Sequence, residues 1–142
     1  MSFSVEVVDW GSAGEALADI RRRVFIAEQS VPEALEWDGL DETALHVLAR
    51  GRMHQPIGCA RLLPGGKIGR MAVLPEWRGQ GVGRSMLNAL LQLARQQGLS
   101  EIKLSAQVAA IPFYQKAGFM VCGDCYLDAG IPHQDMRLAL RT

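Results

Sequence analysis

The sequence has no surplus of charge of either sign and no long hydrophobic run. Its 142 residues hold 15 lysines and arginines against 15 aspartates and glutamates, so the formal net charge is zero. Non-specific nucleic-acid binding draws its affinity from surplus positive charge, so this balance argues against a nucleic-acid partner. No stretch approaches the roughly 20 apolar residues that cross a bilayer. Residues 1–10 lack a basic region followed by an apolar run, so we expect neither a signal peptide nor a membrane partner.

Cysteine is also scarce. Three cysteines are an odd number for a disulfide framework in a chain of this size, which favours reduced thiols and a cytoplasmic location. Cys122 and Cys125 form a lone CxxC motif without a second pair to complete a metal site. We therefore expect structural thiols and no bound metal.

Hydrophobic periodicity divides the chain into alternating strands and helices. The expected strands are 3–8, 44–50, 57–63, 68–74, 101–106, 119–127 and 133–140. The expected helices are 12–29, 81–97 and 108–117. The order β-α-β-β-β-α-β-α-β-β, without repeats or a linker, predicts one α/β domain over residues 1–142.

Three local features of the N-terminal half carry further expectations. Ser12 and Glu15 have the spacing of a capping box at the start of the first helix. Arg21, Arg22 and Arg23 fall mostly on the solvent side of that helix. Segment 30–42 carries five carboxylates around Trp37 and is expected to be an acidic loop. Such a loop either attracts a cationic acceptor or only keeps the protein in solution.

A glycine-rich turn leads from a strand directly into the clearest helix. The turn consists of Gly79, Gln80, Gly81, Val82 and Gly83. Backbone N–H groups at a helix start are unpaired, and the helix dipole favours negative charge there. Glycines let a phosphate approach the backbone closely, and Arg78 and Arg84 bracket the turn as possible phosphate partners. The segment predicts a pyrophosphate cradle, with a ligand-free glycine turn as the alternative.

Two other phosphate-binding motifs do not fit this turn. A Walker loop ends in Gly-Lys followed by Ser or Thr, and the turn has no lysine. The Rossmann fingerprint G-x-G-x-x-G would need a glycine at position 84 or 86, where the sequence has Arg84 and Met86.

Two motifs, in the right order, resemble those of the GNAT (GCN5-related N-acetyltransferase) superfamily. Arg78-x-x-Gly81-x-Gly83 is similar to the signature R/Q-x-x-G-x-G/A, and residues 112–119, PFYQKAGF, resemble the string FYxKxGF. Residues 24–29, VFIAEQ, and 130–133, GIPH, resemble the ElaA/YjcF-like branch. The resemblance implies the GNAT fold, a mixed and mostly antiparallel sheet flanked by helices. It also implies acetyl-CoA as cosubstrate, an amine acceptor and, in many members, a homodimer.

The resemblance implies roles for residues outside the cradle. In GNATs the strand before the cradle splays from its neighbour, and its backbone pairs with the pantetheine arm. A tyrosine on the later helix, here Tyr114, protonates the departing thiolate. Gln107 stands where many members have an asparagine. The residues implied to bind the cosubstrate outside the cradle are Met71, Ala72, Val73, Gln107, Phe113 and Tyr114.

The general base stays open at this point. Several GNATs have a glutamate on the strand before the cradle, but residues 67–71 contain no carboxylate. Glu28, Glu36, Asp38 and His133 are the candidates, and a water chain is another route. Glu28 ends an apolar helical segment, where burial would raise its pKa toward a useful range.

The sequence therefore predicts an acetyl-CoA-dependent N-acetyltransferase in which the primary amine of a small molecule attacks directly in a ternary complex. A catalytically silent CoA-binding sensor or scaffold is the alternative from another class. A protein lysine or N-terminal acetyltransferase is the third hypothesis.

Overall fold

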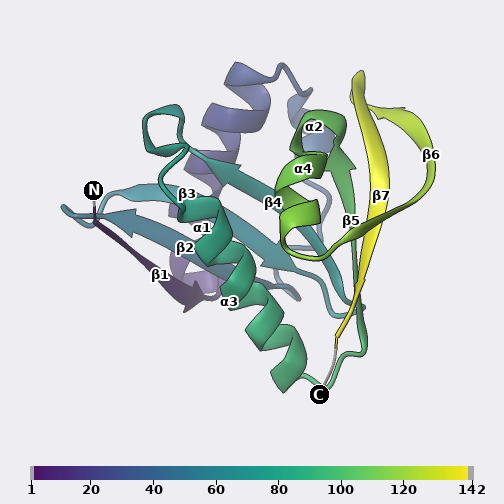
Figure 1. Cartoon of the computed structure of the whole chain (residues 1–142). Coiled ribbons are helices and arrows are strands. Elements are labelled where there is room, and N and C mark those ends of the chain that lie inside the picture. The colour runs from purple at the N-terminus through teal and green to yellow at the C-terminus, as the bar shows by residue number, and fades with distance from the viewer. Residues whose placement is uncertain (1, 141–142) are drawn as a thin grey trace.

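The computed structural model describes residues 2–140 and contains a seven-stranded sheet (Figure 1). Its strands are β1 (Phe3–Val8), β2 (Leu45–Gly51), β3 (Pro56–Leu62), β4 (Lys67–Val73), β5 (Glu101–Gln107), β6 (Met120–Asp128) and β7 (Ile131–Ala139). The strand order is β1-β2-β3-β4-β5-β7-β6, and β4 and β5 are its parallel pair. The expected α/β fold with a mixed, mostly antiparallel sheet is confirmed.

Helices cover both faces of this sheet. They are α1 (Trp10–Arg21), the π-helix η1 (Arg22–Glu28), α2 (Glu33–Glu36), the 3₁₀ turn η2 (Pro75–Trp77), α3 (Val82–Gln96), the 3₁₀ turn η3 (Val108–Ala110) and α4 (Ile111–Lys116). Each strand and helix predicted from the sequence is present, with ends that mostly differ by one or two residues. Figure 1 shows α1 behind the strands and α3 in front of them.

The first helix departs from its expected form at both ends. It begins at Trp10, because the Asp9 carboxylate accepts a hydrogen bond from the Ser12 N–H at 2.7 Å and caps it. The predicted capping box at Ser12 is therefore wrong, and Ser12 lies in the first turn. Beyond Arg21 the helix widens into η1, which ends with the Gln29 N–H bonded to the Val24 carbonyl at 3.1 Å.

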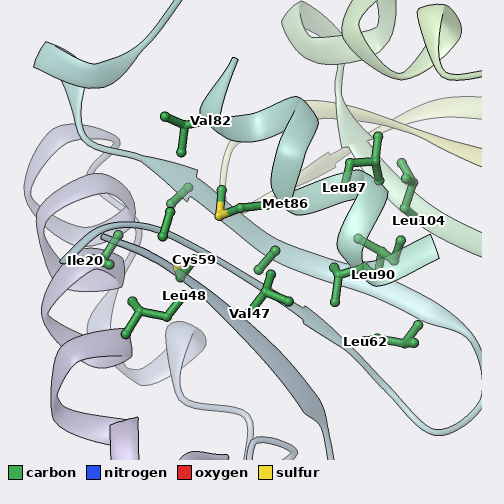
Figure 2. Packing of buried hydrophobic residues seen from close by; sticks show 14 of the residues in the cluster. Ile20, Val47, Leu48, Cys59, Leu62, Val82, Met86, Leu87, Leu90 and Leu104 are labelled. Carbon is green, nitrogen blue, oxygen red and sulfur yellow. The ribbon is translucent and has the colours of Figure 1, made fainter. Parts of the chain in front are cut away.

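The core lies on both sides of the central strands. Val47, Leu48 and Ala49 are consecutive in β2 and fully buried, because α3 packs on β2 and β3 from one face of the sheet and α1 packs on the neighbouring β3 from the other (Figure 1). In Figure 2, Ile20 of α1 lies beside Leu48, while side chains of α3 approach from the opposite side. A strand that is covered on both faces has a continuous apolar run in its sequence. A helix that covers such a strand has one apolar face, and residues 81–97 show this amphipathic pattern.

In the first half of the chain, the burial of Arg21 differs most from what the sequence predicted. Arg21 was expected near solvent, but it is 1% exposed. Its Nε lies 2.8 Å from Glu36 Oε2 and its Nη1 lies 2.7 Å from Asp41 Oδ1. The guanidinium is also 5.5 Å and 5.0 Å from the ring centroids of Trp10 and Trp37. A buried cation needs such partners, which periodicity of the helix alone does not reveal.

Two further arginines extend these contacts into what we call the arginine–carboxylate cluster. Arg61 Nη1 lies 2.9 Å from Asp41 Oδ1 and 3.0 Å from Asp38 Oδ1. Arg70 Nε lies 3.0 Å from Glu36 Oε2. The cluster consists of Arg21, Arg61, Arg70, Glu36, Asp38 and Asp41. Three carboxylates of the expected acidic loop are thus neutralised by arginines, so their attraction for a cationic acceptor loses its basis.

Replacing Arg21 tests whether the cluster holds this loop on the sheet. Arg21→Met leaves Glu36 and Asp41 buried without their principal cation, so the free energy of unfolding should fall by about 3–5 kcal/mol in urea denaturation. Arg23→Met is the matched control, because Arg23 is 61% exposed and pairs with Asp19 on the helix surface. The control should cost less than about 0.5 kcal/mol. Equal, small losses for both variants would contradict this account.

Candidate active site

Strands β4 and β5 separate soon after they meet. Their ladder has two residue pairs, Lys67 with Lys103 and Ile68 with Leu104. Beyond these pairs β4 contains a bulge, because the register against β3 shifts between Cys59 and Arg61. Arg70 lies in this bulge with a positive φ of 52°. Bulges bend a strand and strengthen its twist, so the end of β4 leans away from β5.

The splay leaves the backbone of Val73 without a neighbouring strand on one side. The Leu74 N–H donates to the Ile57 carbonyl at 2.9 Å, toward β3. Peptide groups alternate in direction along a strand, so the N–H and C=O of Val73 point toward the gap beside β5. The Val73 carbonyl accepts a hydrogen bond from Arg78 Nε at 2.9 Å. Its N–H faces the gap, where an extended ligand could add to the sheet.

The predicted cradle lies directly after this strand end. Gly79 and Gly81 have φ values of 76° and 89°, and a Cβ at either position would meet nothing within 4 Å. The glycines are required by the backbone, and the space above them is open. Gly81 is the N-cap of α3 and makes no side-chain capping bond, so the first N–H groups of the helix are available. This arrangement fits an anionic group such as a pyrophosphate.

A groove of about 930 Å³ runs from the cradle between α3 and α4. Most of the residues predicted to bind the cosubstrate line this groove, namely Val73, Arg78, Gly79, Gly81, Val82, Gly83, Arg84 and Phe113. The two helices approach closely at Gly83, where a Cβ would lie 3.4 Å from the Phe113 ring, at van der Waals distance. Gln80 turns its side chain to the Glu76 carbonyl at 3.0 Å, and Ala72 is buried in β4. Any contact from these two residues would have to come from the backbone.

A second pocket, of about 300 Å³, lies beside η1 and segment 30–42. Met71, Gln107, Tyr114 and His133 line it, together with Leu35 and Leu40 of the loop. Tyr114 and Phe113 are neighbours on α4, yet Phe113 lines the groove and Tyr114 lines the pocket. The end of β4 and the start of α4 thus border both spaces.

Tyr114 is held between these spaces with its hydroxyl near the side chain of Met71. Its Oη lies 3.8 Å from Met71 Sδ, and the ring packs edge-on against Phe113 at 5.0 Å between centroids. Burial raises the pKa of the Tyr114 hydroxyl to about 12. The hydroxyl therefore keeps its proton at neutral pH.

The carboxylates considered as bases are all bound to arginines. Glu28 is 39% exposed, and two hydrogen bonds from Arg78, of 2.7 and 2.8 Å, hold its pKa below the usual value. The expected burial and raised pKa of Glu28 are therefore wrong. Glu36 is buried among Arg21 and Arg70 in the cluster. A hydrogen bond from Arg61 holds the pKa of Asp38 far below its ordinary range.

His133 is placed differently from the three carboxylates. It lines the pocket with 9% of its surface exposed, and its Nδ1 lies 2.7 Å from the Ile131 carbonyl. Its ring stacks on Tyr126 with 6.1 Å between centroids. A carbonyl oxygen only accepts hydrogen bonds, so Nδ1 carries a proton, and in the neutral ring the lone pair is on Nε2.

A polar wall beside His133 contains groups that sequence reasoning did not assign to the site. The β5–β7 register sets Ser105 opposite Asp135 and Gln107 opposite His133, on one face of the sheet. Tyr126 joins them, bonded to Ser105 and, at 2.7 Å, to Asp135 Oδ1. The side chain of Gln107 donates to Gln29 Oε1 at 2.8 Å. Only the register across strands brings these residues together, and a single sequence carries no signal for it.

Residues 9–140 match the family model described as an acetyltransferase (GNAT) domain. The chain belongs to the GNAT acetyltransferase family. It is 39% identical over 121 residues to the uncharacterized N-acetyltransferase YjcF of Bacillus subtilis, covering 82% of this chain and 86% of YjcF. The assignment makes the protein an acyltransferase and places it beside YjcF and ElaA, as the sequence motifs predicted.

Solved structures of GNAT proteins agree with this membership. An acyl-CoA N-acyltransferase from Pseudomonas aeruginosa is 32% identical, with a TM-score of 0.86, covering 97% of this chain and 100% of that one. Escherichia coli ElaA is 27% identical, with a TM-score of 0.85, covering 96% of this chain and 99% of ElaA. The splayed strands and the glycine cradle therefore lie in a fold shared with other acyltransferases.

Two findings concern membrane-spanning helices and metal-binding side chains within residues 2–140. No helix in that range has the length and apolar character needed to cross a membrane. In the same part of the chain, His, Cys, Asp and Glu side chains form no group of three or more that could hold a metal ion.

The depressed pKa values in the cluster predict how stability depends on pH. Arg61 lowers the pKa of Asp38, and Arg21 and Arg61 lower that of Asp41 despite its burial. The stability from these carboxylates is complete above their unfolded pKa, about 4, and is lost as pH falls through the lower folded values. Asp38→Asn should cost about 1–3 kcal/mol at pH 7, and this deficit should shrink below about pH 4.

Urea denaturation at several pH values measures this effect. Asp124→Asn is the control, because Asp124 is exposed on β6. Its difference from the wild type should stay within about 0.5 kcal/mol throughout. A deficit for Asp38→Asn that is the same at pH 3 and pH 7 would contradict the ion-pair explanation.

Proposed function

We propose that this chain is one acetyl-CoA-dependent N-acetyltransferase domain that acetylates the primary amine of a small molecule. The amine attacks directly in a ternary complex. The observation that carries the proposal is that two spaces border the end of β4 and α4: an open groove with a glycine cradle and a smaller polar pocket. Phe113 and Tyr114 of α4 line one space each, so a donor and an acceptor can approach the same point.

The groove supplies the groups that a CoA donor needs. The backbone of Gly79 to Gly83 offers N–H groups to the pyrophosphate, and Arg84 and Lys116 bring positive charge to the same groove. Val73 presents its N–H to the gap as a donor for a carbonyl oxygen. Acetyl-CoA would supply the activated acetyl thioester when bound. Met71 borders the pocket, and its backbone and that of Val73 would face the pantetheine arm.

Tyr114 is proposed as the proton donor to the departing sulfur. Its high pKa keeps a proton on Oη at neutral pH, and its position next to Met71 puts that proton at the junction of the two spaces. A positioned acid of this kind contributes about 10²–10⁴ to a rate.

His133 is proposed as the group that takes the proton of the amine. Its Nδ1 donates a hydrogen bond to the Ile131 carbonyl, so Nε2 is the atom that can accept a proton in the pocket. Gln107 and Ser105 line the same pocket and can orient an amine by hydrogen bonds. Glu28 and Glu36 have no part in this proposal, because arginines occupy their carboxylates.

The size and walls of the pocket favour a small acceptor. Segment 30–42 closes one side with Leu35 and Leu40, and the turn between β6 and β7 closes another with Asp128 and Ala129. A volume of about 300 Å³ suits a small molecule better than a polypeptide chain. The pairing of a protonated Tyr114 with an available His133 also favours turnover over a silent CoA-binding role.

Calorimetric titration with acetyl-CoA tests the cradle. Gly81→Glu puts a negative side chain where the pyrophosphate would bind, so the affinity should fall by at least about tenfold. Gly98→Glu is a closely matched control, because Gly98 follows the other end of α3 with a φ of 75° and open space above it. Both variants strain the backbone similarly, but only the cradle variant should lose binding. Wild-type affinity in Gly81→Glu would rule out the cradle.

Steady-state kinetics with an amine library, read through release of the CoA thiol, tests the acid and the base. Tyr114→Phe and His133→Gln should each lower kcat by about 10²–10⁴ while acetyl-CoA affinity changes little. The deficit of His133→Gln should shrink as pH rises, because more of the free amine is already neutral. Full kcat in Tyr114→Phe would mean that the sulfur takes its proton from elsewhere. A pH-independent deficit in His133→Gln would argue against its role as base.

A further inference from the structure

Arg78 was expected from the sequence to grip a phosphate, but all three nitrogens of its guanidinium are bonded within the protein. Nη1 and Nη2 donate to the two carboxylate oxygens of Glu28 at 2.8 and 2.7 Å. Nε donates to the carbonyl of Val73 at 2.9 Å. A two-pronged arginine–carboxylate pair of this kind fixes direction as well as distance. The guanidinium is thus held by protein groups, although the side chain lines the groove.

The two ends of this chain of contacts belong to different parts of the site. Glu28 is the last residue of η1, and the next residue, Gln29, accepts the hydrogen bond from Gln107 in the wall of the pocket. Val73 is the last residue of β4 and lines the groove. The contacts therefore run from the pocket wall to the strand end that borders the groove.

We propose that Glu28 and Arg78 form a strut that positions the end of β4 for acyl transfer, with Glu28 as a positioning residue rather than the base. The effect on the donor rests on the proposed function, whereas the effect on β4 does not. β4 has lost its β5 partner at this point, so one side of its last peptide has no ladder to hold it. Arg78 donates a hydrogen bond to the Val73 carbonyl, and the bonds to Glu28 keep the Arg78 side chain in that orientation. The Val73 N–H in the same strand end then keeps its direction into the gap.

A competing arrangement makes the opposite prediction. If Arg78 is a phosphate ligand, Glu28 competes with the phosphate for its guanidinium. Removing the charge of Glu28 would then free Arg78 and strengthen acetyl-CoA binding. In the strut, the same change loosens the strand end and weakens binding. The sign of one measured change separates the two arrangements.

The first experiment measures acetyl-CoA affinity by calorimetry in Glu28→Gln, Arg78→Lys and the double variant. The strut predicts that each single change weakens binding by about two- to fivefold, and that the double variant is no worse than either, because the two residues act as one unit. Tighter binding in Glu28→Gln, or wild-type affinity in Arg78→Lys, would overturn the strut. Lysine keeps the charge for a phosphate but loses the Nε contact and the fork.

The control for these variants is Glu6→Gln. Glu6 on β1 pairs with Arg50 at 2.6 Å and is 49% exposed, at the far edge of the sheet. Its replacement removes a comparable surface ion pair and should leave acetyl-CoA affinity unchanged. The urea unfolding midpoint should be similar in Glu6→Gln and Glu28→Gln, so that a difference in binding reflects position rather than general stability.

The second experiment uses no ligand and so separates the strut from the proposed function. The Leu74 amide, bonded to the Ile57 carbonyl, reports on the strand end through its hydrogen exchange. Its exchange should be about two- to fivefold faster in Glu28→Gln and Arg78→Lys, and unchanged in Glu6→Gln. Unchanged exchange in all three would overturn the strut. Faster exchange with no acetyl-CoA binding by the wild type would uphold the strut and refute the proposed function.

Discussion

The short pairing between β4 and β5 is the constraint on which both spaces of the site depend. Had the ladder continued beyond Ile68, β5 would bond the peptide groups of β4 that now face the gap. A sheet with an opening of this kind lacks the hydrogen bonds that normally keep a strand straight. The opening therefore has to be held by other means: the bulge at Arg70, the contact of Arg78 with Val73, and the helices packed on either face.

The arginine–carboxylate cluster also helps to hold the opening, and it fixes the loop that forms one wall of the pocket. Arg70 belongs both to the bulge of β4 and to the cluster, so the bend in the strand and the position of the loop are linked through one side chain. Four of its six charged side chains, Arg21, Glu36, Asp41 and Arg61, are buried. Burying charges is costly, and apolar packing of the same volume often stabilises a fold as well. What ion pairs add is directional bonding, which suits a segment with little regular structure.

The sequence predicted most features that depend on neighbouring residues, and few of the contacts between residues far apart in the chain. Strands, helices and the glycine turn follow from patterns within a few residues, as does the place of Tyr114 in its family motif. Glu28 was misjudged because its partner, Arg78, lies 50 positions away in the chain. Arg21 was misjudged because the carboxylates that make its burial possible belong to the loop. The wall with Gln107 and His133 depends on strand register, which alternation alone does not set.

The balance of charge in the cluster has a consequence for how such a protein can diverge. A change at any one of its six positions leaves a partner uncompensated, so those positions can be exchanged only in matched sets. The pocket has other walls that are free of this restriction, including Leu35, Leu40 and Ala129. New acceptor preferences can therefore arise by substitution of these apolar residues, while the framework that holds the opening in the sheet stays as it is.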